Sequence, residues 1–193
     1  MDEVITKRIL AKNDTAKDVL RLQYEKNQAV LRNLFSFSGA VLDLKGYVGE
    51  SEFIDTYPFV PYQFRLMQNV LAQIRKHGNS GKNLSGGERS MLLAFQEAAQ
   101  KIQGEDEYAL IPFSLFYDTV HTFLESSIRR VIDRCQSAAD NKDGIEEYDV
   151  SILKLLYLVR YVDDVKANLD NITVLMTDDI RADKITMRQT IQQ

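Results

Sequence analysis

The sequence contains very little cysteine, proline or glycine, and it has no tryptophan. Its 193 residues include one cysteine, three prolines and nine glycines. Because Cys135 has no second cysteine to pair with, an intrachain disulfide is excluded, which fits a reducing compartment. Proline and glycine interrupt helices, so their scarcity predicts long helices with few breaks.

Long apolar runs and an excess of basic charge are absent as well. The sequence has no run of about 18 or more apolar residues, the length that a membrane-spanning helix needs. Its acidic first residues lack the apolar core of a signal peptide. The 24 Lys and Arg against 28 Asp and Glu give a net charge of -4, which argues against bulk electrostatic binding to nucleic acid or anionic lipid. We therefore expect a cytoplasmic protein with no membrane partner.

Apolar residues recur at helical spacing along most of the chain, and this pattern predicts an all-α fold. Helices are expected over about 4–10, 16–35, 61–76, 85–99 and 112–139, the last being the longest. Residues 39–49 are expected to be irregular with a short strand. Three short helices should follow, the first capped by Asp149 and the third starting near Asp183. The charged linker at 140–147 is the predicted boundary between a region over 1–140 and a three-helix segment over 147–193.

A glycine-rich stretch from Gly78 to Asn83 has only a superficial likeness to a phosphate-binding loop. That motif needs four residues between its glycines and a Ser or Thr after its lysine. Here two residues separate Gly78 from Gly81, and Asn83 follows Lys82. We therefore interpret 79–83 as a polar loop between helices, and the chain has no Walker A motif of its own.

The segment Leu-Ser-Gly-Gly-Glu-Arg at 84–89 resembles the signature sequence of ABC transporter ATPases. An ABC domain is disfavoured, because the acidic stretch that follows contains Pro112 and no buried strand. Two interpretations remain. In one, Ser85 and Glu88 form a capping box at a helix start. In the other, the same helix start also binds a nucleotide phosphate, with Ser85, Gly86, Gly87 and Arg89 as the candidate residues.

Other chemistry-bearing residues form no recognisable motif. The two histidines, His77 and His121, make no metal-ligand spacing with Cys135, so neither a metal site nor a catalytic residue is predicted. The aromatic residues around 57–64 and 113–116 are interpreted as core anchors. Basic residues that could contact DNA lie among acids, on the helix before 140 and on the last helix: Arg129, Arg130, Arg134, Arg181, Lys184 and Arg188.

Several segments resemble the large P-loop ATPases of BREX bacteriophage-exclusion systems, the BrxC or PglY type. The resemblance covers most of the chain and rests on YPFVPYQF at 57–64, HG at 77–78, LSGGERSML at 84–92, AFQEAA at 94–99, YVDDVKANLDN at 161–171 and LMTDDI at 175–180. It implies an internal piece of a longer AAA+ type protein, downstream of the Walker motifs. On this basis 1–140 would be a helical lid-like region, and 147–193 a three-helix, winged-helix-like segment.

The resemblance also implies a function. ATP and Mg would be bound by the full-length parent, and this piece would be inactive alone, with no cofactor of its own. It would couple the nucleotide state of the missing core to other phage-defence proteins or to DNA, and the parent could be a homo-oligomer. In this interpretation Arg89 approaches the γ-phosphate. The alternatives are a protein-interaction module with no nucleotide contact, or a small helical DNA-binding domain.

Overall fold

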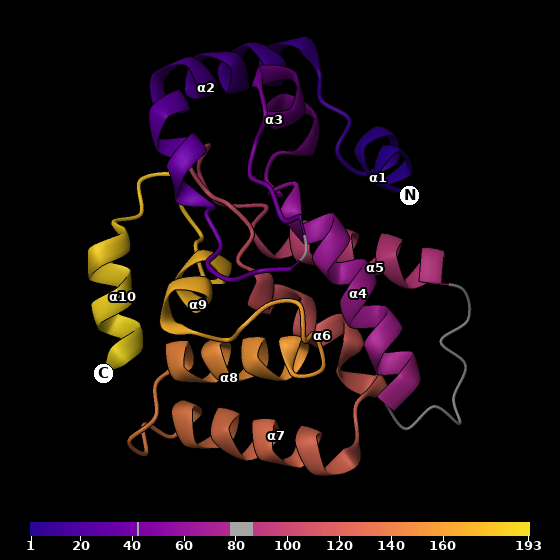
Figure 1. The fold of residues 1–193 in the computed structure, drawn as a ribbon, viewed down its shortest axis with the longest axis vertical. Coiled ribbons are helices and arrows are strands. Elements are labelled where there is room, and N and C mark those ends of the chain that lie inside the picture. The colour runs from indigo at the N-terminus through magenta and orange to yellow at the C-terminus, as the bar shows by residue number, and fades with distance from the viewer. Residues whose placement is uncertain (42, 78–86) are drawn as a thin grey trace.

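The computed structural model describes residues 1–41, 43–77 and 87–193, and it confirms the all-α prediction. These residues form ten α-helices and two 3-10 helices (Figure 1). The α-helices are α1 Asp2–Arg8, α2 Asp14–Leu34, α3 Glu50–Thr56, α4 Tyr62–His77, α5 Gly87–Lys101, α6 Tyr117–Val120, α7 Ser126–Asp140, α8 Glu147–Val159, α9 Leu169–Leu175 and α10 Lys184–Gln192. The 3-10 helices are η1 Phe113–Phe116 and η2 His121–Phe123.

The short strand expected within 39–49 is wrong for the residues that the structure describes there. The described chain contains a single isolated β-bridge, between Ala109 and Asp179. Residues 43–49 have no neighbouring strand to pair with. Instead, the hydroxyl of Tyr47 donates a hydrogen bond to the carbonyl oxygen of Phe59 at 2.8 Å, which holds this irregular segment on the core.

The longest helix in the described ranges is α2, with 21 residues. It begins where Asn13 accepts a hydrogen bond from the backbone N–H of Ala16 at 2.8 Å, which satisfies one of the free donors of the first turn. Its inner side packs on α3, a short helix that the sequence pattern did not reveal. The rings of Tyr24 and Phe53 lie 5.6 Å apart at this contact.

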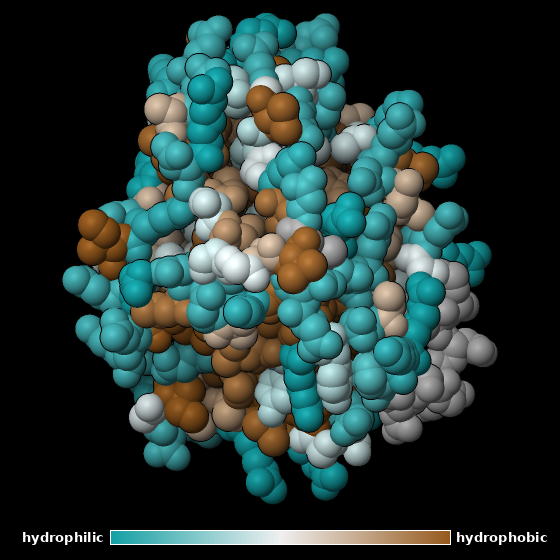
Figure 2. Space-filling model, in the orientation of Figure 1, coloured by the Kyte–Doolittle hydropathy of each residue, from teal (hydrophilic) through white to brown (hydrophobic). Residues whose placement is uncertain are grey.

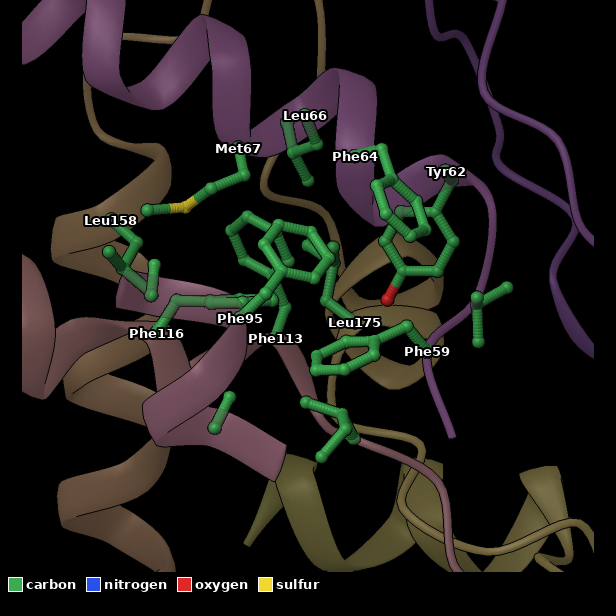
Figure 3. Close-up of a cluster of buried hydrophobic side chains, with 14 of the residues drawn as sticks. Phe59, Tyr62, Phe64, Leu66, Met67, Phe95, Phe113, Phe116, Leu158 and Leu175 are labelled. Carbon is green, nitrogen blue, oxygen red and sulfur yellow. The ribbon is translucent and has the colours of Figure 1, made fainter. Parts of the chain in front are cut away.

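The centre of the fold is a cluster of aromatic rings between α4, α5 and η1 (Figure 3). Phe95 of α5 is fully buried, and its ring centroid lies 4.6 Å from those of both Phe59 and Phe64. Phe116 of η1 closes the cluster, 5.0 Å from Phe95. The prediction that these aromatic residues are core anchors is confirmed, and their packing fixes α5 against α4.

The long helix expected over 112–139 is wrong. The chain there forms η1, α6 and η2, is extended at Leu124, and becomes helical again only in α7. A 3-10 turn places residues three apart on one side, so both Phe113 and Phe116 can be fully buried. The β-branched residues around Val120 also disfavour a continuous helix.

The predicted boundary at 140–147 falls in the loop between α7 and α8. These helices form an antiparallel pair (Figure 1), and α8 also packs on η1. One buried cluster takes residues from both sides of the loop, including Ile132 and Leu155. The division into 1–140 and 147–193 therefore stays a prediction about the parent protein, whereas the described chain has a shared core.

The three short helices predicted after the loop are confirmed as α8, α9 and α10. The predicted cap residue is three positions too late, because Glu146 and not Asp149 is the N-cap of α8. The carboxylate of Asp149 accepts a hydrogen bond from the backbone N–H of Glu146 at 2.9 Å. Helix α8 carries apolar side chains on more than one side. Figure 2, in the orientation of Figure 1, shows apolar surface over α8.

A buried amide fastens the start of α9 to a distant segment. Asn171 is fully buried, and its side chain exchanges hydrogen bonds with the backbone N–H and carbonyl of Ser38 at 2.8 and 3.0 Å. The same amide donates to the carbonyl of Lys166 at 2.8 Å. The side chain thus joins the segment that follows α2 to the loop between α8 and α9.

Candidate functional site

The start of α5 is the part of the predicted phosphate site that the structure describes. It begins at Gly87, whereas Ser85 and Gly86, the capping box with Ser85, and the loop at 78–83 lie outside the described residues. The guanidinium of Arg75, from the last turn of α4, lies against Gly87. A side chain at position 87 would have to displace that guanidinium, so the glycine allows the two helix ends to approach closely.

Positive charge exceeds negative charge where the end of α4 meets the start of α5. Arg75 is favourably placed at the carboxyl end of α4 but also meets the amino end of α5, where the helix dipole is positive. Glu88, in the first turn of α5, offsets part of this positive charge. Both side chains line a small hollow together with Met91. The guanidinium of Arg75 and the start of α5 both contribute positive potential to this hollow, which favours the binding of an anion there.

Arg89 stands on another side of the same helix start. Its side chain is exposed and lines a hollow of about 440 Å³ with Glu97 and Thr119. Among the described residues it forms no ion pair. The structure therefore brings Gly87 together with Arg75, which the sequence analysis missed, and directs Arg89 to a separate hollow.

The histidines and the cysteine do not meet. His77 stacks on Tyr161, with ring centroids 4.8 Å apart, and Nδ1 of His121 lies 2.7 Å from the carbonyl oxygen of Asp118. Cys135 is half-buried on α7. In the ranges 1–41, 43–77 and 87–193, no group of three His, Cys, Asp or Glu side chains could hold a metal ion.

The basic residues of the last segment are engaged within the chain. Arg181 pairs with Asp179 and with Asp106 at 2.7 and 3.1 Å. Arg188 pairs with Asp170. These contacts occupy the side chains that a DNA-recognition helix would present to phosphates or bases.

Lys12 is a second residue that sequence reasoning missed. It lies half-buried between α1 and α2, and its ammonium donates to the carbonyl oxygens of Leu10 and Asp55 at 2.8 and 3.3 Å. Burial lowers the pKa of Lys12 from 10.5 to about 8, and the negative charge of Asp55 opposes this shift. Only one sequence signal points to the burial of Lys12, which is its position just after the apolar pair Ile9 and Leu10.

The lowered pKa of Lys12 predicts a pH-dependent stability. Between pH values of about 8 and 10.5 the unfolded chain holds a proton on Lys12 that the folded chain has partly lost. The contribution of Lys12 to the free energy of unfolding should therefore rise as the pH increases through this window, whereas the tyrosines whose pKa burial raises act in the opposite direction as the pH approaches 10. Urea denaturation at about pH 7.5 and about pH 9.5 measures the rise, which Lys12→Met should reduce. Lys26→Met, at an exposed position of α2, is the matched control, and an equal rise in both variants would contradict the prediction.

No family model matches the chain, and no solved structure matches it. No helix of the described residues is long and apolar enough to cross a membrane.

Proposed function

We propose that this chain is a non-catalytic helical section of a BREX-type P-loop ATPase, which couples the nucleotide state of the ATPase core to partner proteins or DNA. The observation that carries the proposal is the arginine-flanked start of α5. Arg75 and Arg89 lie on two sides of it, and backbone N–H groups of the first turn point the same way as the helix dipole.

The segments that resemble this family also contact each other, which supports the proposal. Phe59 and Phe64, from the first segment, pack on Phe95 of the α5 segment. His77, at the end of α4, stacks on Tyr161, which begins the later segment. Residues far apart in the sequence thus pack together along α4 and α5, as expected if these helices form a rigid unit that presents their junction to a nucleotide.

The proposed role of Arg89 is to stabilise charge on the γ-phosphate of ATP bound to the core. Arginine stays charged at every relevant pH and can bind phosphate oxygens with two N–H groups. We expect Arg89→Ala in the full-length protein to reduce ATP turnover about tenfold to a thousandfold, equivalent to about 2–4 kcal/mol of transition-state stabilisation. A phosphate-release assay measures the effect.

Arg130→Ala is the matched control for this experiment. Arg130 is an exposed arginine of α7 and lines neither hollow at the start of α5. Its replacement should leave ATP turnover unchanged. If Arg89→Ala hydrolyses ATP at the normal rate but unfolds at a lower temperature, Arg89 serves packing or capping and the phosphate assignment is wrong.

A protein-interaction module without nucleotide contact is the second candidate function. It is favoured by an open apolar groove beside α1, α2 and α5. The DNA-binding alternative has less support, because Arg181 and Arg188 pair with carboxylates of the same chain.

A further inference from the structure

Two adjoining hollows form a groove lined by the end of α1, the first turns of α2 and the second half of α5, on the side of the molecule where α1 lies (Figure 1). Their volumes are about 570 and 460 Å³. Ile9, Ala99 and Gln103 line both of them, so the hollows are continuous. A volume of this size is typical of a binding site for another molecule.

The groove has an apolar floor. Its wall on α2 includes Val19, which keeps 43% of its surface exposed, and Leu22, one turn further along α2, is 56% exposed. Exposed apolar side chains beside an open hollow are typical of a surface that another chain covers. The apolar floor residues are Ile9, Leu10, Ala16, Leu20, Ala99 and Ile102.

The two ends of the groove carry opposite charge. Glu105 and Glu107 line one end, and they form no ion pair with any described residue. Arg8 lines the other end. Asp106 lies between the two glutamates, but Arg181 already pairs with it at 3.1 Å.

Lys12 does not neutralise the acidic end. Its amine donates to two backbone carbonyl oxygens, at 2.8 and 3.3 Å, and makes no ion pair with Glu105 or Glu107. The acidic end therefore faces outward with its negative charge available to a partner.

We propose that this groove binds an amphipathic helix of a partner protein, whose apolar side chains cover the floor and whose lysine or arginine residues lie beside Glu105 and Glu107. Burial of apolar surface supplies the affinity. An amphipathic helix laid into an apolar groove is a recurring mode of recognition. The glutamates at the acidic end favour a partner that places basic residues there over one that places acidic residues there.

Charge also distinguishes this partner from other occupants. Exposed glutamates repel the phosphates of nucleic acid and the headgroups of anionic lipid. A second copy of this chain, which carries a net charge of -4, offers no excess of basic residues. The proposal does not depend on the ATPase assignment, because neither Arg75 nor Arg89 lines the groove.

The test uses two fluorescent synthetic helical peptides with identical leucine positions, one with lysines and one with glutamates at its charged positions. We expect the lysine peptide to bind the 193-residue chain about five- to tenfold more tightly, as measured by fluorescence anisotropy at low salt. Val19→Asp should abolish binding of both peptides. Leu93→Asp, at a position on α5 that is 49% exposed outside the groove, should leave binding unchanged.

A second pair of variants isolates the charge. Glu105→Lys with Glu107→Lys should remove or reverse the preference for the lysine peptide. Asp140→Lys with Asp143→Lys makes the same change in net charge at exposed positions, at the end of α7 and in the loop that follows it, and it should preserve the preference. Far-ultraviolet circular dichroism checks that each variant is folded.

Three outcomes would overturn the proposal. The first is equal affinity for the two peptides, and the second is binding that survives Val19→Asp. The third is a concentration-dependent dimer in sedimentation experiments that Val19→Asp dissociates, which would make a second copy the occupant. A loss of affinity confined to the groove variants, with the lysine preference removed by the Glu105 and Glu107 changes, supports it.

Discussion

Phe95→Ala should lower the free energy of unfolding by about 3–5 kcal/mol. The ring is fully buried and lies within 5.0 Å, centroid to centroid, of the rings of Phe59, Phe64 and Phe116. Its removal loses the transfer free energy of the ring and leaves a cavity that the surrounding rings cannot fill. Urea denaturation followed by far-ultraviolet circular dichroism measures the loss.

Leu93→Ala is the control on the same helix. Leu93 is 49% exposed, so its replacement should change the free energy of unfolding by less than about 1 kcal/mol. Because a domain of this kind is stable by about 5–15 kcal/mol in total, Phe95→Leu provides a milder variant if the alanine variant does not fold. An equal, small loss for Phe95→Ala and Leu93→Ala would contradict a central role for this ring.

Gln63→Leu should lower the free energy of unfolding by about 2–5 kcal/mol, because it removes the hydrogen bonds of two backbone groups inside the core. Gln63 is fully buried near the first turn of α4. Its Oε1 accepts from the N–H of Val60 at 3.0 Å, and its Nε2 donates to the carbonyl oxygen of Ile111 at 2.6 Å. Leucine fits the space approximately but can satisfy neither group.

Urea denaturation gives the size of the effect, and hydrogen exchange at the amide of Val60 gives its location. That amide should exchange faster in Gln63→Leu than in Gln68→Leu, which changes an exposed glutamine of the same helix. If both variants lose less than about 1 kcal/mol and protection at Val60 is unchanged, water replaces the side chain and the prediction is wrong.

The fold class and most helices could be predicted because their signals are local. In α2, α4 and α5, apolar residues at helical spacing are bounded by capping residues or glycine, and these determine a helix without reference to the rest of the chain. The aromatic residues around Phe59 and Phe64 were identified as core for the same reason. Their large apolar rings are stable only where several elements bury them.

The failures occurred where distant contacts decide the local structure. The pattern over 112–139 fits a helix throughout, but burial of Phe116 against Phe95, and of Phe113 against Phe116, favours a 3-10 turn there. Helix α3 has only seven residues, too few to show a clear period, and it is stabilised by its packing on α2.

The candidate site was only partly predictable. The start of α5 was identified from its glycines and from Arg89, because a helix start is a local feature. Arg75 could not be connected with Gly87, since their contact depends on how α4 and α5 pack. The acidic and apolar parts of the groove likewise come from α1, α2, α5 and the segment after α5, which no single stretch of sequence brings together.

The hydrogen bonds of the buried Asn171 amide determine when the fold can be completed during synthesis. Its partner Ser38 is 133 residues earlier in the chain. At ribosomal speeds of about 5–20 residues per second, Ser38 is made roughly 7–27 s before the amide that holds it. The backbone groups of Tyr108 and Leu110 likewise form hydrogen bonds with Ile180 and Asp178, which are translated much later. The nascent protein can therefore form its early helices first, but it can complete these contacts of its core only after Ile180 has been translated.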